Sequence, residues 1–245
     1  MHTVSKSEKK MVKALSVKKY RQQEKMFVVE GVKPVNELLE HAPSKVFKIF
    51  TVDREKLNVP IDEEKVFVVS EKDLKSLSNL KNPQGVIALA EFIEKPLVNM
   101  GLTLVLDNIQ DPGNLGTIIR SAEWFGVTEV VCSNSTVDKF NPKVVQAAMG
   151  ALFRVVVNYV DLEEYLKSTK RPIYGALLEG ENLYESTLNK EAVLVMGNEG
   201  NGISEEIKSY LTHPVTIPKL GEGESLNVSI ATAVLLSEFA RQISL

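Results

Sequence analysis

The feature that most constrains the fold of this chain is an alternation of short apolar runs with helical patterns between residues 102 and 245. The runs are apolar at nearly every position, which is typical of strands buried on both faces of a sheet. Strands of this kind joined by helices form a parallel sheet covered by helices on both sides. The predicted strands are Thr103–Asn108, Thr128–Ser133, Phe153–Tyr159, Pro172–Leu178, Ala192–Asn198 and Pro214–Pro218, and the predicted helices are Leu115–Phe125, Pro142–Gly150, Leu162–Ser168, Ser204–Leu211 and Asn227–Ile243.

Residues 1–95 show shorter, mixed elements and predict a second, smaller α/β unit. A turn signal, Asn82-Pro83-Gln84-Gly85, precedes the last of its strands. The segment Glu91–Gly101 has little periodicity, which is typical of a linker. We therefore predict two α/β domains, residues 1–95 and residues 96–245. The predicted helices of the smaller domain are Lys6–Leu15 and Val35–Ala42, and its predicted strands are Met26–Gly31, Val46–Val52, Val66–Val69 and Gly85–Phe92.

Charge is distributed unevenly along the chain. The 245 residues have a formal net charge of −3 at pH 7, but residues 1–25 contain eight Lys and Arg against two Glu, a local charge of +6. A basic end on an acidic body can attract the phosphates of a nucleic acid without making the whole surface basic. A solvated helix face is the alternative explanation, and the sequence leaves both open.

Composition excludes several classes of protein. The single cysteine, Cys132, cannot form a disulfide framework or a cysteine-rich zinc site within one chain. No apolar run reaches 18 residues and the N-terminal sequence lacks the apolar core of a secretory signal, so we expect no membrane span and a cytoplasmic protein. The histidines His2, His41 and His213 are scattered, and we expect neither a histidine-driven mechanism nor a bound metal.

Three segments rich in glycine, amides and charges each follow a predicted strand of the larger domain: Leu106–Val127, Leu194–Ser204 and Ile217–Gln242. Ligands of parallel α/β sheets bind outside the carboxyl ends of the strands, which is where these segments fall. Common nucleotide motifs do not account for them. The chain has no G-x-x-x-x-G-K-[S/T], and its GNEGNG sequence has the glycines in a different order from a dinucleotide fingerprint.

Together the three segments resemble, in order and spacing, the three signature motifs of the SpoU (TrmH-like) family in the SPOUT superfamily of RNA methyltransferases. This resemblance implies a catalytic domain with a parallel sheet and a deep trefoil knot, which is a rare exception among folds. The N-terminal stretch is similar, more loosely, to the L30e-like substrate-binding domain that precedes the catalytic domain in many members. The matching residues are Asp111–Gly116, Arg120–Ala122, Phe125 and Gly126 in the first motif, Gly197–Gly200, Gly202 and Ser204 in the second, and Ile217, Pro218, Gly221 and Glu224–Ser229 in the third.

The resemblance implies transfer of a methyl group from S-adenosylmethionine to a ribose 2'-hydroxyl of RNA. In the family, backbone groups at the positions of Gly197, Ile217 and Leu226 hold this cofactor. Glycines allow the tight turns and close backbone approach that such a ligand needs, although any one of them could serve only to make a turn. The full candidate cofactor site is Gly197, Ile217, Leu226, Met196, Gly202, Leu178 and Asn227.

The candidate catalytic residues are Arg120, Glu199, Ser225, Asn227 and Asn114. The resemblance implies that Arg120 helps to deprotonate the hydroxyl. Because a guanidinium is a very poor base, we favour a grip on the phosphate beside the target ribose, with the phosphate assisting proton transfer. Glu199 is expected to orient Arg120, Ser225 and Asn227 to position the hydroxyl and the cofactor, and Asn114 to contact RNA or brace the loops.

Each of these residues also has a purely structural alternative. Asn114, Ser225 and Asn227 belong to the residue types that cap helices. Arg120 could instead be an ordinary helix-surface residue paired with Glu123 or Glu199.

Three functions stay open on the sequence alone. The first is an RNA ribose 2'-O-methyltransferase acting on ribosomal RNA or, as the alternative, on transfer RNA. The second is a catalytically silent RNA-binding protein of the same fold, which the intact motif residues disfavour. The third is an enzyme with another nucleotide cofactor, which the missing dinucleotide fingerprint disfavours. The family works as homodimers with the last helix at the interface, and the apolar positions Ile230, Val234 and Phe239, spaced i, i+4 and i+9, leave room for such a face.

Overall fold

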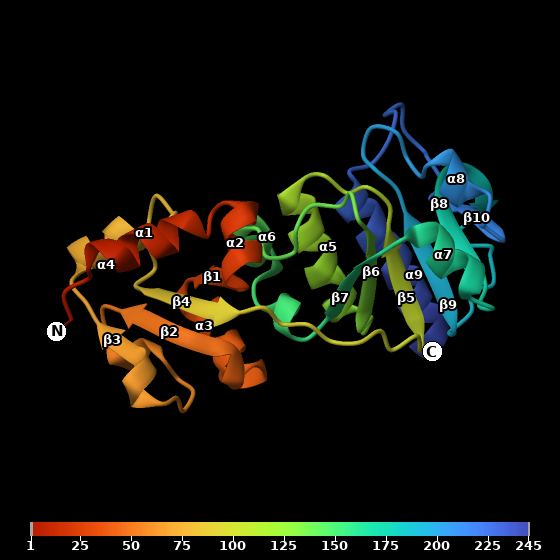
Figure 1. The fold of residues 1–245 in the computed structure, drawn as a ribbon. Coiled ribbons are helices and arrows are strands. Elements are labelled where there is room, and N and C mark those ends of the chain that lie inside the picture. Colours follow the sequence, from red (N-terminus) through yellow and green to blue (C-terminus); the bar gives the residue numbers. More distant parts are fainter. Residues whose placement is uncertain (1, 245) are drawn as a thin grey trace. The chain divides into compact units, whose positions relative to one another are not determined.

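The computed structural model describes residues 2–244 and divides the chain into two compact units (Figure 1). The first unit comprises the chain up to Ile93 together with Asp138–Phe153, and the second comprises Glu94–Val137 and the chain from Arg154 onward. Each unit contains its own sheet. No helix within the described range is long and apolar enough to cross a membrane.

The first unit is built on a four-stranded sheet in the order β1-β4-β2-β3. Strand β4 pairs antiparallel with β1 and β2, whereas β3 pairs parallel with β2. The strands are β1 (Met26–Glu30), β2 (Val46–Thr51), β3 (Val66–Val68) and β4 (Val86–Glu91), and the helices are α1 (Lys6–Ala14), α2 (Lys18–Glu24), α3 (Val32–His41), α4 (Glu71–Leu77) and α6 (Pro142–Ala148). Short 3-10 helices are η1 (Pro43–Lys45), η2 (Arg54–Lys56), η3 (Glu63–Lys65) and η4 (Ala151–Phe153).

The four predicted strands of this unit are present, and so are the predicted helices that correspond to α1 and α3. Helices α2 and α4 are additional; each has seven residues, a length at which helical periodicity is hard to detect. Helix α4 begins at a local signal, because the side chain of Ser70 accepts the N–H of Asp73. Its Leu77 packs in the same apolar cluster as Val12 of α1, so tertiary burial stabilises α4 together with α1.

A buried ion pair ties residue 138 to α2. Arg21 donates to Oδ2 of Asp138 from Nε at 3.0 Å and from Nη2 at 2.7 Å, and the two side chains are only 2% and 8% exposed. The Nη1 group of Arg21 donates to the main-chain oxygens of Leu15 and Ser16. The guanidinium is therefore hydrogen-bonded on several sides, which is what makes its burial tolerable.

Aromatic packing holds the rest of this segment in the first unit. The Phe140 ring stacks on Phe27 at 4.4 Å and on Phe92 at 4.3 Å between ring centroids. Further along, Gly150 has φ +95°, and a Cβ at that position would lie 2.6 Å from Cγ of Glu37. Both the backbone conformation and the close contact require glycine here. Residues 138–153 are thus part of the core of the first unit, although they are distant from it in sequence.

We expect Arg21→Met to destabilise the first unit by about 3–5 kcal/mol, because it leaves the carboxylate of Asp138 buried without its charged partner. Urea unfolding followed by circular dichroism measures the loss. The control is Lys9→Met, which breaks the partly exposed pair between Lys9 and Asp73 (3.2 Å) and should cost less than about 1 kcal/mol. Equal losses in the two variants would contradict the importance of the buried pair.

The second unit contains a six-stranded sheet in the order β10-β8-β9-β5-β6-β7, with every neighbouring pair parallel. This confirms the α/β fold with a parallel sheet. The trefoil knot implied by the family resemblance stays a prediction. The strands are β5 (Leu102–Leu106), β6 (Glu129–Ser133), β7 (Val156–Val160), β8 (Ile173–Asn182), β9 (Ala192–Met196) and β10 (His213–Thr216), and the helices are α5 (Pro112–Trp124), α7 (Leu162–Ser168), α8 (Glu205–Lys208) and α9 (Val228–Ser244).

Parallel pairing brings the candidate ligand segments to one edge of this sheet. Leu106 lies opposite Met196 in the β5–β9 register, so the loops that follow the two strands begin side by side. The N–H of Asp107 donates to the main-chain oxygen of Met196 at 2.9 Å and extends the pairing by one more bond. Strand β10, which precedes the third segment, ends at Thr216.

Helix α9 has 17 residues and packs against α5 (Figure 1). Ile230 is 55% exposed and Val234 is half-buried, but Phe239 is fully buried, with its ring edge-to-face on Tyr174 at 5.2 Å. The expectation that Phe239 shares an exposed face with Ile230 is therefore wrong. Nine positions correspond to about two and a half helical turns, which puts the two residues on opposite sides of the helix.

Candidate functional site

The first of the three segments forms the loop after β5 and the start of α5. Asp111 is the N-cap of this helix, and its side chain accepts the N–H of Asn114 at 2.8 Å. Pro112 occupies the first helical position, where its missing N–H has no cost. The helix thus begins at Pro112 rather than at the predicted Leu115, and Asn114 lies in its first turn instead of capping it. The side chain of Asn114 is free to bind other segments.

The second segment is a closed loop between β9 and α8. Asn198 and Gly202 exchange two backbone hydrogen bonds, of 2.8 and 2.9 Å. Gly202 has φ +69°. A Cβ at Gly197 would lie 2.1 Å from the carbonyl carbon of Gly202. Both glycines are therefore needed for the loop to close, in addition to any contact they make with a ligand.

Asn114 joins all three segments. Its Nδ2 donates to Oε1 of Glu199 at 2.5 Å, and its Oδ1 accepts from Nδ2 of Asn227 at 3.1 Å. The Oδ1 of Asn227 accepts from the N–H and the hydroxyl of Ser229 at the start of α9, at 2.9 and 2.6 Å. Asn227 therefore both caps the helix and contacts the other segments. The structure brings together three of the five predicted catalytic residues.

Arg120 lies on α5 and has an exposed side chain. Within residues 2–244 this side chain forms no hydrogen bond or ion pair. Neither of the partners considered from sequence binds it: Glu123 accepts from Arg154 at 2.9 Å, and Glu199 accepts from Asn114. The expected contact between Glu199 and Arg120 is thus not formed in this structure. An exposed guanidinium with unpaired N–H donors is suited to binding a phosphate.

Ser225 lies in the exposed loop 219–227 between β10 and α9, and it does not cap α9. The candidate cofactor residues around this edge differ in exposure. Met196 is buried at the end of β9, and Ile217 is half-buried after β10. Leu178 on β8 is 77% exposed and Leu226 is 52% exposed. The second unit therefore presents exposed apolar side chains on β8, which pairs with β9, and in the loop before α9.

Three polar residues to which the sequence analysis assigns no role support this edge, namely Asp107, Asn108 and Asn198. Asp107 is 6% exposed, and its Oδ2 accepts the N–H of Ser204 at 2.8 Å. Asn198 donates from Nδ2 to the main-chain oxygen of Asn108 at 2.8 Å. A usable signal was present, because all three stand within two residues of the last apolar residue of β5 or β9.

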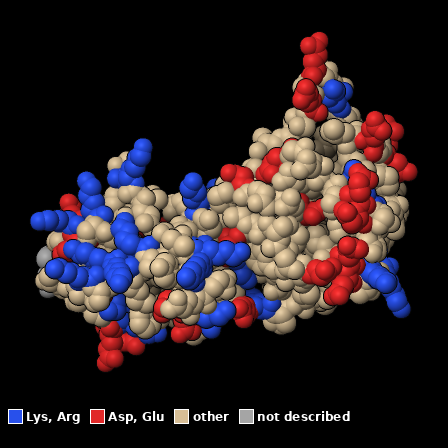
Figure 2. Space-filling view, turned by 45° about the horizontal axis from the view of Figure 1, so that its top comes forward, with Lys and Arg blue, Asp and Glu red and all other residues tan. Residues whose placement is uncertain are grey.

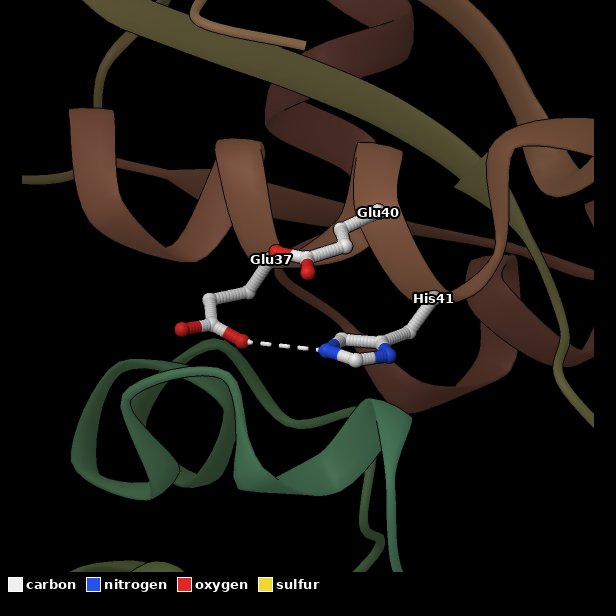
Figure 3. A group of neighbouring side chains, drawn as sticks. All are labelled: Glu37, Glu40 and His41. Carbon is white, nitrogen blue, oxygen red and sulfur yellow. Dashed lines mark ion pairs between the residues drawn. The ribbon is translucent and has the colours of Figure 1, made fainter.

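A separate group of possible metal ligands lies on α3 in the first unit (Figure 3). Ligand atoms of Glu37, Glu40 and His41 lie within 4.8 Å of one another. Nε2 of His41 pairs with Oε2 of Glu37 at 3.5 Å, with the i, i+4 spacing of a helix-surface ion pair. Glu40 and His41 are exposed, and exposed acidic groups of this kind are common without a metal. The ion pair is sufficient to explain the group.

Fold and site together define an α/β protein with three polar segments at the carboxyl edge of a parallel sheet, preceded by a smaller α/β unit. The SpoU rRNA Methylase family matches residues 101–237, and the MRM3-like substrate binding domain matches residues 7–88. The chain therefore belongs to the SpoU rRNA methylase family, as its three motifs predict.

Individual relatives extend this similarity over nearly the whole chain. The 23S rRNA (guanosine(2553)-2'-O)-methyltransferase RlmP of Bacillus subtilis is 32% identical over 231 residues, which cover 91% of this chain and 92% of that protein. A solved structure of a TrmH-family protein from Porphyromonas gingivalis is 40% identical with a TM-score of 0.89, covering 98% of this chain and 100% of the other. An AdoMet-bound rRNA methyltransferase from Sinorhizobium meliloti is 27% identical with a TM-score of 0.87, covering 100% and 98%.

We expect Gly197→Ala to destabilise the second unit markedly, because the new Cβ would meet the backbone of Gly202 and not a flexible side chain. Gly221→Ala is the matched control, since a Cβ there meets nothing within 4 Å. Thermal unfolding of both variants checks the expectation. A melting temperature lowered equally by the two substitutions would count against the steric explanation.

Proposed function

We propose that this chain transfers a methyl group from S-adenosylmethionine to a ribose 2'-hydroxyl of ribosomal RNA. The observation that carries the proposal is the junction at Asn114, which binds Glu199 and Asn227, while the guanidinium of Arg120 on the same helix has no partner among residues 2–244. Amide and carboxylate side chains can bind a hydroxyl, and a guanidinium can bind a phosphate. Transfer RNA is the second candidate, and the rRNA-specific names of relatives such as RlmP favour ribosomal RNA.

The residues at the carboxyl edge fit S-adenosylmethionine. The tight loop at Gly197 and Gly202 offers backbone groups without side chains in the way, and Leu178 and Leu226 offer exposed apolar side chains for a nucleoside. Met196, Ile217 and Asn227 complete this candidate cofactor site. When bound, the cofactor supplies a methyl group activated by a sulfonium. Support comes from the AdoMet-bound relative with the same overall fold.

The catalytic roles follow from the chemistry of the side chains. Arg120 binds the phosphate beside the target ribose through two parallel N–H donors and so orients the 2'-hydroxyl. A phosphate oxygen accepts the hydroxyl proton, because a guanidinium has no lone pair to take it. Ser225 and Asn227 position the hydroxyl and the polar end of the cofactor. Glu199 and Asn114 hold the surrounding segments in place.

RNA binding is assigned to the first unit on the basis of charge. This unit has 19 Lys and Arg against 14 Asp and Glu, a net +5, whereas the second has 10 against 18, a net −8. Figure 2 shows Lys and Arg spread over the first unit and groups of Asp and Glu over the second. Lys10 on α1 and Lys18 and Lys19 on α2 are exposed. Exposed cations of this kind supply the sequence-independent part of RNA affinity.

The cytoplasm is the location we propose for this activity. Cys132, the single cysteine of the sequence, is buried, and so low a cysteine content fits a reducing compartment.

The test of the function is tritiated methyl transfer from S-adenosylmethionine to unmodified total RNA. We expect label in RNA and a loss on the order of 10²–10³-fold for Arg120→Ala, with a smaller loss for Arg120→Lys, which keeps the charge but not the bidentate geometry. Lys208→Ala, on the surface of α8, is the control. Cofactor binding without transfer would favour a catalytically silent RNA-binding protein, and no cofactor binding at all would refute the proposal.

We expect a triple variant, in which Lys10, Lys18 and Lys19 are each replaced by Gln, to bind RNA more weakly. The slope of log K against log salt concentration should become shallower by about one unit per lost phosphate contact. Substitution is preferable to deleting residues 1–25, because Val12, Leu15 and Arg21 are buried in the first unit. The matched control replaces three exposed lysines of the second unit, Lys167, Lys170 and Lys190. Identical slopes in both triple variants would contradict the assignment of RNA binding to the first unit.

A homodimer through the second unit is the assembly we propose. Helices α5 and α9 pack together, and each exposes a large apolar side chain: Trp124 is 81% exposed and Ile230 is 55% exposed. A dimer would bury these groups. We expect the wild-type chain to sediment as a dimer at micromolar concentration and the Trp124→Glu, Ile230→Glu variant to sediment as a monomer. A monomeric wild-type chain would show that these residues are not a dimer interface.

A further inference from the structure

The loop between β9 and α8 depends on one amide side chain, that of Asn198. Its Oδ1 accepts the N–H groups of Gly200 at 2.8 Å and Asn201 at 3.3 Å, which turns the loop back on itself. Its Nδ2 donates to the main-chain oxygen of Asn108 at 2.8 Å, in the loop after β5. One side chain therefore shapes the second candidate segment and links it to the first.

The acceptor of this link is itself held in place. Asn108 has φ +59°, a left-handed conformation that is uncommon for a residue other than glycine. Its N–H donates to Oγ of Ser133 at 2.9 Å, and its Oδ1 accepts from Nε2 of Gln110 at 2.6 Å. The same Nε2 donates to the main-chain oxygen of Ser135 at 2.6 Å. The carbonyl that Asn198 contacts is thus oriented by the loops after β5 and β6.

The link bears directly on Glu199, the next residue along the chain. Glu199 reaches Asn114 at 2.5 Å across the gap between the two loops, and both groups are on the surface or half-buried. A single hydrogen bond between such groups contributes little free energy, so it does little by itself to hold Glu199 in place. How well the carboxylate of Glu199 meets Asn114 therefore depends on how the two loops are held together, and the Asn198–Asn108 bond does this one residue away.

We propose that Asn198 is a positioning residue for methyl transfer, which holds Glu199 against Asn114 through its bond to Asn108. The inference rests on the proposed function. Only an amide can act in this way here, because it accepts from Gly200 and donates to Asn108 with one side chain. An aspartate has nearly the same shape and keeps the acceptor, but it replaces the donor with an oxygen that repels the Asn108 carbonyl.

The test compares Asn198→Asp with Asn201→Asp. Both place the same new charge in the same loop, but Asn201 takes part only through its main-chain N–H. We expect Asn198→Asp to lower kcat on the order of 10- to 100-fold and Asn201→Asp to keep the wild-type value. Circular dichroism and binding of S-adenosylmethionine establish that each variant is folded. If Asn198→Asp does not fold, Asn198→Ser, whose hydroxyl is too short to reach Asn108, replaces it.

A double-mutant cycle with Glu199→Gln separates positioning from general destabilisation. If Asn198 acts through the Glu199 carboxylate, the substitution at 198 lowers kcat much less in the Glu199→Gln background than in the wild-type chain. Full additivity of the two effects, or a wild-type kcat for Asn198→Asp, overturns the inference. An inactive wild-type chain refutes the proposed function instead, so the two failures are distinguishable.

Discussion

The parallel pairing of β5 with β9 is the constraint on which the site depends. With Leu106 opposite Met196, both strands end at the same level, and the polar residues that follow them start side by side. Burial on both faces makes these strands apolar at nearly every position, so alternation of side chains cannot fix their register. Hydrogen bonds beyond the strand ends therefore help to fix the register: the N–H of Ser204 donates to Asp107, and the side chain of Asn198 donates to Asn108.

The general position of the site could be predicted from sequence because the strands end abruptly. A fully apolar run followed at once by Asp107, or by Gly197, identifies both the end of a buried strand and the loop that faces a ligand. The association of residues 138–153 with the first unit could not be predicted in this way. Asp138 lies 117 positions from Arg21 in sequence, and no local pattern indicates that the two are paired.

The identity of the site residues could likewise be predicted from sequence, whereas their contacts could not. Asn114, Glu199 and Asn227 could be chosen from motif resemblance, but the partner of Glu199 could not, because Arg120 and Asn114 lie on one helix and both suit a carboxylate. Capping was a real alternative for Asn227, and the structure shows capping together with a contact to Asn114. Residue type limits which bonds are possible, whereas the three-dimensional placement of loops selects among them.

Under the proposed function, the division of charge gives Arg120 a more specific role than attraction of RNA. With a net charge of −8, the second unit repels polyanions at distances within a Debye length of about 8 Å. If the chain binds RNA as proposed, one exposed guanidinium does not offset this charge, and we expect the affinity to come from the first unit, at +5. Under the proposed function, Arg120 then binds one phosphate of an RNA that is already held. In this proposal Arg120 contributes to the orientation of the ribose rather than to the affinity for RNA.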